Sequence, residues 1–312
     1  MNFQQLEYII AVDNLRHFAK AADACYVTQP TLSMMIQKLE EEIGIKIFDR
    51  SKQPIVPTNA GVEVILQARK IIYEGGKMKE ILNDLNGEIK GELKLGIIPT
   101  VAPYLLPLFL STFLKKYPLL KVRIIEQTTV ELVEKLKQQH LDAAIIATPL
   151  NIATLNEQPL YYEPFMVYAP GNPLLMKKKF LLPADINTDK LWLLEEGHCM
   201  RAQALNLCEL RQKDLKHGNL EYEAGSIETL KKMVDITNGI TILPELAIPD
   251  LSKKEQKNIR HFKAPEPVRE ISMVTYRHFV KQRIVDLLSE EIKKSVPPEM
   301  HDAKRKTITE IS

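Results

Sequence analysis

The chain has 312 residues, more than a single hydrophobic core usually organises, so its length predicts two domains and a connector. Hydrophobic residues make up 45% and charged residues 26%, as in an ordinary globular protein, and no apolar run approaches the roughly 18–20 residues that span a bilayer. A membrane-spanning protein is therefore excluded, while the net charge of +2 neither favours nor excludes a nucleic-acid partner.

The N-terminal stretch MNFQQLEYIIAVDNLRHF lacks the basic segment and apolar block of a signal peptide. We therefore expect the protein to remain in the cytoplasm, with no membrane partner. Three cysteines, Cys25, Cys199 and Cys208, are too few for a secreted disulfide scaffold. In a reducing compartment cysteines are usually buried apolar fillers, and less often metal ligands or redox groups.

Helical spacing of apolar residues predicts three short helices near the N-terminus, over residues 2–13, 18–25 and 31–43. Thr28 can cap the third helix, Pro30 is tolerated in its first turn, and Gly44 supplies its end. Two short strands, Ile45–Phe48 and Ile55–Val56, would flank a polar turn. Residues 1–57 are therefore predicted to form a winged helix-turn-helix, all-α with a small β wing, that binds DNA.

The charge of this segment tests that interpretation. Residues 1–60 hold six basic and seven acidic side chains, whereas DNA-binding domains are usually more basic. A DNA-binding role therefore requires that the acidic and basic side chains lie on different faces.

A single long linker helix is predicted over residues 58–90. Its apolar stripe includes Val62, Ile65, Leu66, Ile72, Met78, Ile81, Leu82 and Leu85. A stripe on a helix outside both domains needs a partner, which predicts a dimerisation helix. Gly75 and Gly76 each cost about 1 kcal/mol relative to alanine, so we expect a bend or break there.

Strands and helices alternate over residues 91–300, which predicts an α/β domain with parallel sheets and crossover helices. Ligands of such folds bind beyond the carboxyl ends of strands. Thr100 follows the strand ELKLGII and Thr129 follows VRIIEQ, so both occupy that kind of position. Residues 301–312 are predicted to be a polar tail.

Cys199 and Cys208 lie nine positions apart, separated by the strong helix formers of MRAQALNL. A helix over this segment would hold the two Cα atoms roughly 13 Å apart and on opposite faces. A disulfide needs Cα atoms within roughly 7 Å, so oxidation of the pair would require the helix to unwind. Cys199 would lie at the helix start, where negative charge is favoured and a thiolate is easier to form.

The stretch FAKAADACYVTQPTLSMMIQKLEEEIGIKIFDR, followed by PTNAG, resembles the helix-turn-helix of LysR-type transcription regulators. The resemblance implies a two-lobed effector domain like a periplasmic binding protein, with lobe I about 91–164 and 268–300 and lobe II about 165–267. It also implies a homodimer or homotetramer that binds double-stranded promoter DNA, with RNA polymerase as a further partner. The recognition helix would be Thr28–Glu42, and the implied DNA contacts are Thr28, Gln29, Pro30, Thr31, Ser33, Gln37 and Lys38, with Arg50 and Lys52 on the wing.

This sequence departs from the family pattern at Met34 and Met35, where polar or basic residues are frequent. Together with the acidic run Glu40-Glu41-Glu42, this departure suggests weak affinity per monomer and a dependence on assembly.

The segments LLEEGHCMRAQALNLC, GIIPTVAPYLLP and EPVRE resemble the hydrogen-peroxide-sensing members of this family. That resemblance implies that peroxide oxidises Cys199 to a sulfenic acid and that Cys208 resolves it into a disulfide, which activates oxidative-stress genes. Peroxide would be bound or activated by Thr100, Thr129, His198 and Arg269. A glutaredoxin- or thioredoxin-type reductant would reverse the oxidation. No cofactor, metal or enzymatic turnover is expected.

Other interpretations remain open. The effector domain could bind a small anionic metabolite between its lobes, with the cysteines as bystanders. The protein could also be a thiol peroxidase, although such an enzyme has no use for a winged helix and a dimerisation helix. An architectural DNA-binding protein without a sensing role is the third alternative.

Overall fold

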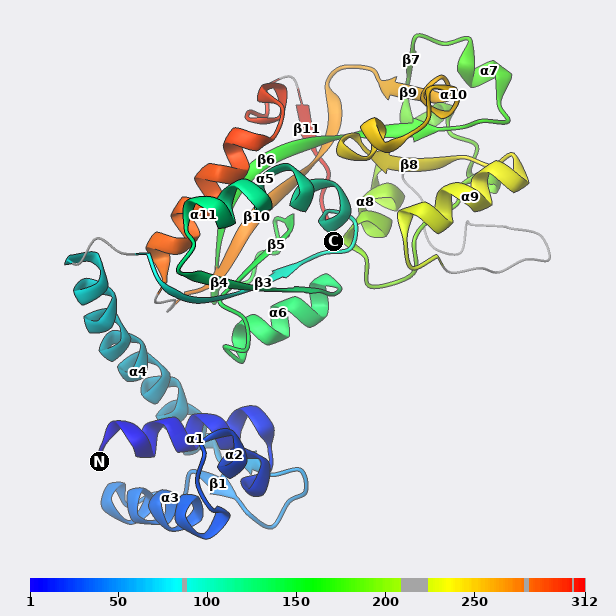
Figure 1. The fold of residues 1–312 in the computed structure, drawn as a ribbon. Coiled ribbons are helices and arrows are strands. Elements are labelled where there is room, and N and C mark those ends of the chain that lie inside the picture. The colour runs from blue at the N-terminus through cyan, green and yellow to red at the C-terminus, as the bar shows by residue number, and fades with distance from the viewer. Residues whose placement is uncertain (86–88, 209–223, 278–280, 305, 312) are drawn as a thin grey trace. The chain divides into compact units, whose positions relative to one another are not determined.

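The structure is a computed structural model that describes residues 1–85, 89–208, 224–277, 281–304 and 306–311. The chain divides into two compact units, one containing Met1–Glu88 and the other containing Ile89–Arg277 and Gln282–Ser312. Figure 1 labels the elements of both units. In the described part of the chain, no helix is both long and apolar enough to cross a membrane.

The first unit begins with three helices, α1 (Phe3–Leu15), α2 (Phe18–Ala24) and α3 (Gln29–Ile43). Each has a side-chain N-cap, because Asn2, His17 and Thr28 accept hydrogen bonds from backbone N–H groups of the first turns. The C-cap of α3 is Gly44, in the left-handed conformation with φ 74°. The helices enclose a core that includes Leu6, Ile9, Leu32, Ile36, Leu39 and Phe48.

The wing consists of β1 (Phe48–Asp49) paired antiparallel with β2 (Val56–Pro57). The first predicted strand, Ile45–Phe48, is wrong in extent, because only Phe48 of it belongs to β1, and the second, Ile55–Val56, is shifted by one residue in β2. The reason is the buried Glu40 carboxylate, which accepts hydrogen bonds from the backbone N–H groups of Ile47 (2.8 Å) and Phe48 (3.3 Å). The donors of this segment therefore bind a side chain of α3 instead of extending the strand ladder.

The long helix α4 runs without interruption from Asn59 to Leu85. The predicted break at Gly75-Gly76 is therefore wrong. Gly75 has a packing role instead: a Cβ atom added there would lie 2.6 Å from the ring of Phe3, so the glycine lets α1 approach α4. Glycine destabilises a helix interior, and the close contact between α1 and α4 explains why it is nevertheless found at this position.

The second unit is built on a mixed sheet with strand order β4-β3-β5-β10-β6-β9-β7. Its parallel part comprises β3 (Gly91–Ile97), β4 (Leu120–Glu126) and β5 (Ala143–Thr148), connected by α5 (Ala102–Lys116) and α6 (Thr129–Lys137). The predicted arrangement of parallel strands with crossover helices is found in these three strands. Figure 1 shows α5 beside α11 (Gln282–Ser295) on one face of this part and α6 on the other.

Two long strands, β6 (Leu155–Tyr168) and β10 (Glu266–Tyr276), are antiparallel to each other, and β10 is also antiparallel to β5. Up to Pro164, β6 pairs with β10; from Phe165 it pairs with β8 (Thr241–Pro244), and from Met166 also with β9 (Ile259–Phe262). The sheet thus has two halves that share β6. The second half also carries α8 (Cys199–Leu207), α9 (Ile227–Thr237) and β7 (Phe180–Leu181).

Short elements complete this unit: α7 (Pro173–Met176), α10 (Lys253–Gln256) and 3-10 turns at Pro183–Asp185, Thr188–Lys190, Glu245–Asp250 and Pro298–Met300. The predicted polar tail over 301–312 is partly structured. β11 (Lys306–Ile308) pairs parallel with the start of β10, and the Thr309 N–H donates to the Val268 carbonyl at 2.8 Å. The polar composition of this segment gave no indication of a strand, because backbone hydrogen bonds rather than apolar side chains hold the strand in place.

Candidate functional site

The Cys199 thiol is buried at the first turn of α8, directly after the N-cap His198. Its Sγ donates a hydrogen bond to the Thr129 Oγ1 at 2.9 Å. Thr129 begins α6 at the carboxyl end of β4, so the contact joins a helix of one half of the unit to a strand end of the other. The structure thus brings Thr129, one of the residues expected to bind peroxide, into contact with Cys199.

Burial raises the pKa of the Cys199 thiol above its ordinary value, because an apolar environment disfavours the thiolate. The Thr129 hydroxyl and the positive charge of Arg269 act in the opposite direction. The net shift is upward, so the helix start does not by itself produce a thiolate in this conformation. The expected ease of forming a thiolate at this helix start is therefore outweighed by burial in this conformation.

Arg269 lies fully buried beside this site, on β10, and its strand partner on β6 is Glu163. The guanidinium donates to the Glu163 carboxylate through Nε at 2.8 Å, and its Nη2 lies 2.7 Å from the same oxygen. It also donates to the Thr100 hydroxyl at 2.9 Å and to the Thr100 carbonyl at 3.0 Å. Thr100, Glu163 and Arg269 therefore form one buried, charge-compensated network.

Glu163 was not among the predicted site residues. Its other carboxylate oxygen accepts from the Leu246 N–H at 2.9 Å, which also fixes the start of a 3-10 turn in the second half of the unit. The sequence did hold a signal, because Glu163 is the single charge within the otherwise apolar or neutral stretch LYYEPFMVY. A single acidic side chain in a buried strand requires a buried cation nearby. Arg269 is the one basic residue of the mostly apolar stretch PVREISMV.

His198 is buried, and its Nε2 lies 3.6 Å from the carboxylate of Glu195, whose side chain is partly exposed. The predicted residues thus fall into two bonded groups, Cys199 with Thr129 and Arg269 with Thr100. Arg269 links the groups through its charge, and His198 adjoins them through the chain.

Cys208 is the C-cap of α8 and is half-buried, and both it and Cys199 are free thiols. Burial raises the pKa of Cys208 to about 11. The predicted helix between the two cysteines is confirmed, and nine helical steps of about 1.5 Å separate their Cα atoms by roughly 13 Å. A bond between these sulfurs therefore requires α8 to lose its helical form.

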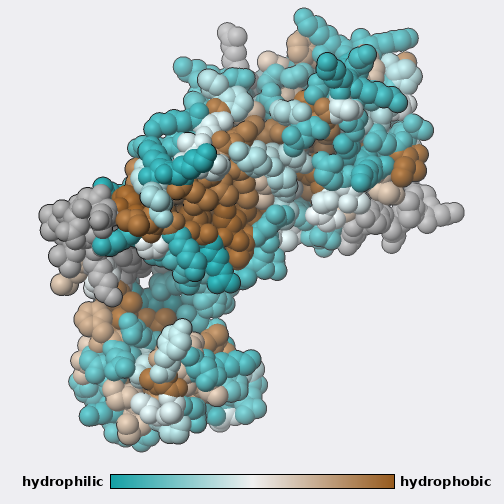
Figure 2. All heavy atoms as spheres, viewed as in Figure 1, coloured by the Kyte–Doolittle hydropathy of each residue, from teal (hydrophilic) through white to brown (hydrophobic). Residues whose placement is uncertain are grey.

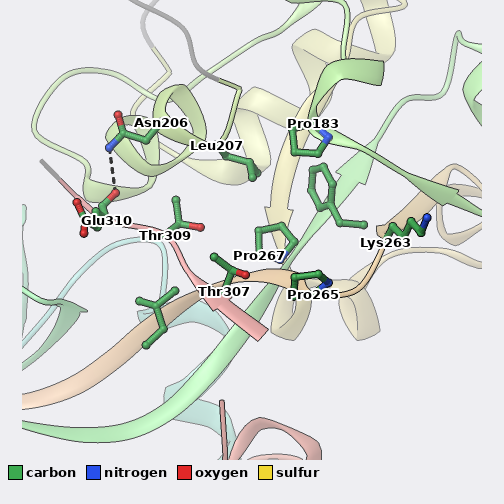
Figure 3. Close-up of a pocket in the computed structure, with 11 residues that line it drawn as sticks. Pro183, Asn206, Leu207, Lys263, Pro265, Pro267, Thr307, Thr309 and Glu310 are labelled. Atoms are coloured by element: carbon green, nitrogen blue, oxygen red, sulfur yellow. Dashed lines mark hydrogen bonds between the residues drawn. The ribbon is translucent and has the colours of Figure 1, made fainter. Parts of the chain in front are cut away.

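The C-terminal segment is attached to α8. The fully buried Gln203 donates to the Thr309 carbonyl at 3.0 Å. Asn206 donates to the Glu310 carbonyl at 3.1 Å, and Figure 3 shows this second bond. A pocket of about 480 Å³ lies beside these bonds, lined in part by Leu207 and Pro267. Loss of the helical form of α8 around Gln203 and Asn206 would displace the donors of both hydrogen bonds.

The predicted DNA contacts lie on the surface of the first unit. Thr28, Gln29, Pro30, Thr31, Gln37 and Lys38 of the recognition helix are exposed, as are Arg50 and Lys52 of the wing, whereas Ser33 is half-buried. Arg50 donates to the Ser33 hydroxyl at 3.3 Å and to the Glu40 carboxylate at 3.4 Å. The wing arginine is therefore held against the recognition helix.

The acidic run Glu40-Glu41-Glu42 should repel DNA less strongly than the sequence suggested. Glu40 is buried, holds the wing backbone and pairs with Lys46 and Arg50. Glu42 pairs with the N-terminal amine at 2.6 Å. Two of the three carboxylates are thus compensated within the unit, and the inference of weak affinity from this run loses much of its basis.

Cys25 is half-buried and packs against the core of the first unit, as expected of an apolar filler. Burial raises its pKa, which disfavours its oxidation. Within the described residues, no group of three or more His, Cys, Asp or Glu side chains could hold a metal ion.

Models of known protein families match both units of the chain. Residues 3–62 match the family model "Bacterial regulatory helix-turn-helix protein, lysR family", and residues 86–296 match "LysR substrate binding domain". These matches confirm the predicted fold class, a helix-turn-helix followed by an α/β effector domain.

Individual relatives cover nearly the whole chain. The "Hydrogen peroxide-inducible genes activator" of Haemophilus influenzae is 35% identical over 301 residues, covering 94% of this chain and 98% of that protein. The "DNA-binding transcriptional dual regulator OxyR" of Escherichia coli is 36% identical, covering 88% of this chain and 89% of that protein. A full-length OxyR variant from Pseudomonas aeruginosa superposes with a TM-score of 0.76 at 32% identity, covering 95% of this chain and 99% of that structure.

Proposed function

The chain belongs to the LysR family of bacterial transcription regulators, and from its OxyR-like relatives we propose that it is a redox-sensing regulator that responds to hydrogen peroxide. Cys199 is the sensing thiol and Cys208 the resolving thiol. Oxidation changes the conformation of the effector domain, and the winged helix carries that change to promoter DNA in the cytoplasm.

A single observation carries this proposal: the Cys199 thiol lies 2.9 Å from the Thr129 hydroxyl, on a helix whose far end holds a second free thiol. A hydroxyl at the strand end can orient peroxide and stabilise the leaving oxygen. The Arg269 charge favours the thiolate, and Glu163 keeps that charge in place. A metabolite-binding regulator would not need a buried thiol in such surroundings.

The reaction proceeds in two balanced steps. The Cys199 thiolate attacks one peroxide oxygen, the O–O bond breaks, and the sulfur becomes a sulfenic acid while hydroxide leaves and takes up a proton to form water. The Cys208 thiolate then attacks the sulfenic sulfur, forming the S–S bond and releasing a second water after proton uptake. Two electrons pass from the two thiols to peroxide, and a dithiol reductant of the glutaredoxin or thioredoxin type returns them. The protein acts as a stoichiometric switch, not as an enzyme.

Self-association has a suitable surface on the second unit. Figure 2 shows a broad apolar area on the face where α5, the edge strand β4 and α6 meet. Exposed members of these elements and their connections are Leu108, Leu114, Leu119 and Val130. An area of this kind marks an interface in a soluble protein, and an assembly of two or four chains would double or quadruple the DNA contacts. RNA polymerase would be the further partner at the promoter.

The test is intact-mass and thiol-alkylation analysis of the full chain before and after one equivalent of hydrogen peroxide. We expect the loss of two thiols, a crosslinked peptide between Cys199 and Cys208, and a Cys25 that remains free. In a Cys208→Ser variant, a dimedone adduct should form on Cys199 instead. If all three thiols survive peroxide, or if Cys199→Ser still responds to peroxide on DNA, the metabolite-binding alternative replaces this proposal.

A further inference from the structure

The recognition helix α3 has two clearly different faces. Leu32, Ile36 and Leu39 are completely buried and face the core of the first unit. The opposite stripe follows the helical repeat through Thr31, Met34, Lys38 and Glu41, all of them exposed. Because the helix-turn-helix presents one face of this helix to the major groove, this stripe is the one that meets base edges.

Met34 occupies the middle of that stripe, one turn after Thr31 and one turn before Lys38. It is 61% exposed, whereas the neighbouring Met35 is half-buried against the core and its carbonyl accepts from Gln5 at 3.2 Å. The two methionines therefore have different roles. Met35 packs the domain, and Met34 contributes nothing visible to it.

Several polar groups around Met34 already have partners within the protein. The Thr31 hydroxyl lies 2.8 Å from the Thr28 hydroxyl, and the Gln37 amide donates to Glu41 at 2.9 Å. Ser33 accepts from Arg50. These polar side chains of α3 thus already use part of their hydrogen-bonding capacity within the protein, so they contribute less to the recognition of bases. The apolar side chain of Met34 lies at the centre of the exposed stripe.

Among the groups that base pairs present in the major groove, the C5 methyl of thymine is the apolar one. An unbranched, polarisable thioether can follow its surface without a strict geometry. We propose that Met34 is a specificity-determining residue that recognises a thymine methyl in each half-site of the operator. This inference rests on the proposed DNA-binding function, and it gives the Met34 departure from the family pattern a positive role.

The test compares thymine with deoxyuracil, which lacks only the methyl group. Duplexes bound by the full chain are first selected from a random pool, and the preferred sequence is then made with each dT replaced in turn by dU. At one position per half-site, wild-type affinity should fall about fourfold, the value expected for one buried methyl. Met34→Gln should bind the dT and dU duplexes equally, and Met34→Leu should keep the preference for dT.

Because Met34 is exposed, these variants should unfold at the wild-type temperature, which thermal melts would check. If dU is tolerated everywhere by the wild type, or if Met34→Gln loses affinity on dU as the wild type does, the inference is overturned. Those results would leave sequence-specific binding intact. A chain that selects no sequence at all would instead overturn the proposed DNA-binding function, and this inference with it.

Discussion

The hydrogen bond between Cys199 and Thr129 controls how easily the sensing thiol ionises. Thr129→Val keeps the shape of the side chain but removes the hydroxyl, one of the groups that lower the pKa of Cys199 against the effect of burial. A hydrogen bond to a charged group contributes about 1.5–3 kcal/mol, so peroxide oxidation should slow about tenfold or more. Alkylation of Cys199 as a function of pH should show its midpoint shifted to higher pH. Thr129→Ser retains the hydroxyl and should stay near wild type; a Val variant with an unchanged midpoint would contradict this role.

Glu163 and Arg269 stabilise the fold as a pair, since each would otherwise be a buried, unpaired charge. Arg269→Met should lower the free energy of unfolding by roughly 3–5 kcal/mol, because it leaves the Glu163 carboxylate without its cation. The double change Glu163→Met with Arg269→Met should cost clearly less than the sum of the single changes. Urea denaturation of the four proteins measures the coupling. Additive losses would mean that the two charges act independently.

At the scale of elements, helices with local signals were predictable and long-range features were not. The cap at Thr28, the first-turn Pro30 and the stop at Gly44 defined α3 from a few adjacent residues. By contrast, β11 pairs with a distant strand and α8 binds the backbone that follows it, which polar composition does not reveal. The packing role of Gly75 in α4 depends on Phe3 of another helix.

The same contrast holds for the site. The positions of Cys199 at a helix start and of Thr100 and Thr129 after strands could be predicted from local sequence, whereas their role with peroxide came from the family resemblance. Glu163 was missed because its role depends on the register between β6 and β10, which only the paired sheet defines.

Gly61 at the start of α4 allows the helix to approach the wing strand closely. A Cβ at this position would overlap the Ile47 carbonyl oxygen, a backbone atom that cannot move aside cheaply. Gly61→Ala should therefore destabilise the first unit by about 1–3 kcal/mol, as overpacking does, and weaken DNA binding in proportion. The matched control is Ala60→Ser at the adjacent exposed position, which should melt as wild type does. An equally stable Gly61→Ala protein would show that α4 can shift away from the wing.

The C-terminal strand should report the state of α8. Gln203 and Asn206 hold the backbone of Thr309 and Glu310, so unwinding of α8 removes two of the contacts that retain this segment. After peroxide treatment, amide hydrogen exchange over residues 306–311 should become faster in the wild type. Cys208→Ser can be oxidised at Cys199 but cannot form the disulfide, and it should retain protection. Unchanged exchange in a protein whose disulfide has been verified by mass would mean that α8 deforms without disturbing its C-terminal end.

For the molecule as a whole, the placement of charged side chains matters more for DNA binding than the net charge does. The first unit combines a nearly neutral count with exposed cations at Lys38, Arg50 and Lys52, while Glu40 is buried among the residues that fix the wing. The requirement that acidic and basic groups be segregated is therefore met in part by burial. Affinity then depends on how many copies of this cationic surface reach the duplex at once.

The salt dependence of binding can count those copies. Lys52 is exposed on the wing, and its ammonium lies 3.9 Å from the Asp49 carboxylate, so it is available to a phosphate. Each phosphate contact contributes about 0.9 to the slope of log K against log salt, so Lys52→Gln should reduce the slope by about 0.9 for one engaged wing, about 1.8 for a dimer and about 3.6 for a tetramer. Lys253→Gln, an exposed change on the second unit, should leave the slope unaltered. A slope that is the same for Lys52→Gln and wild type, measured by fluorescence anisotropy from low to physiological salt, would place the wing away from the DNA backbone.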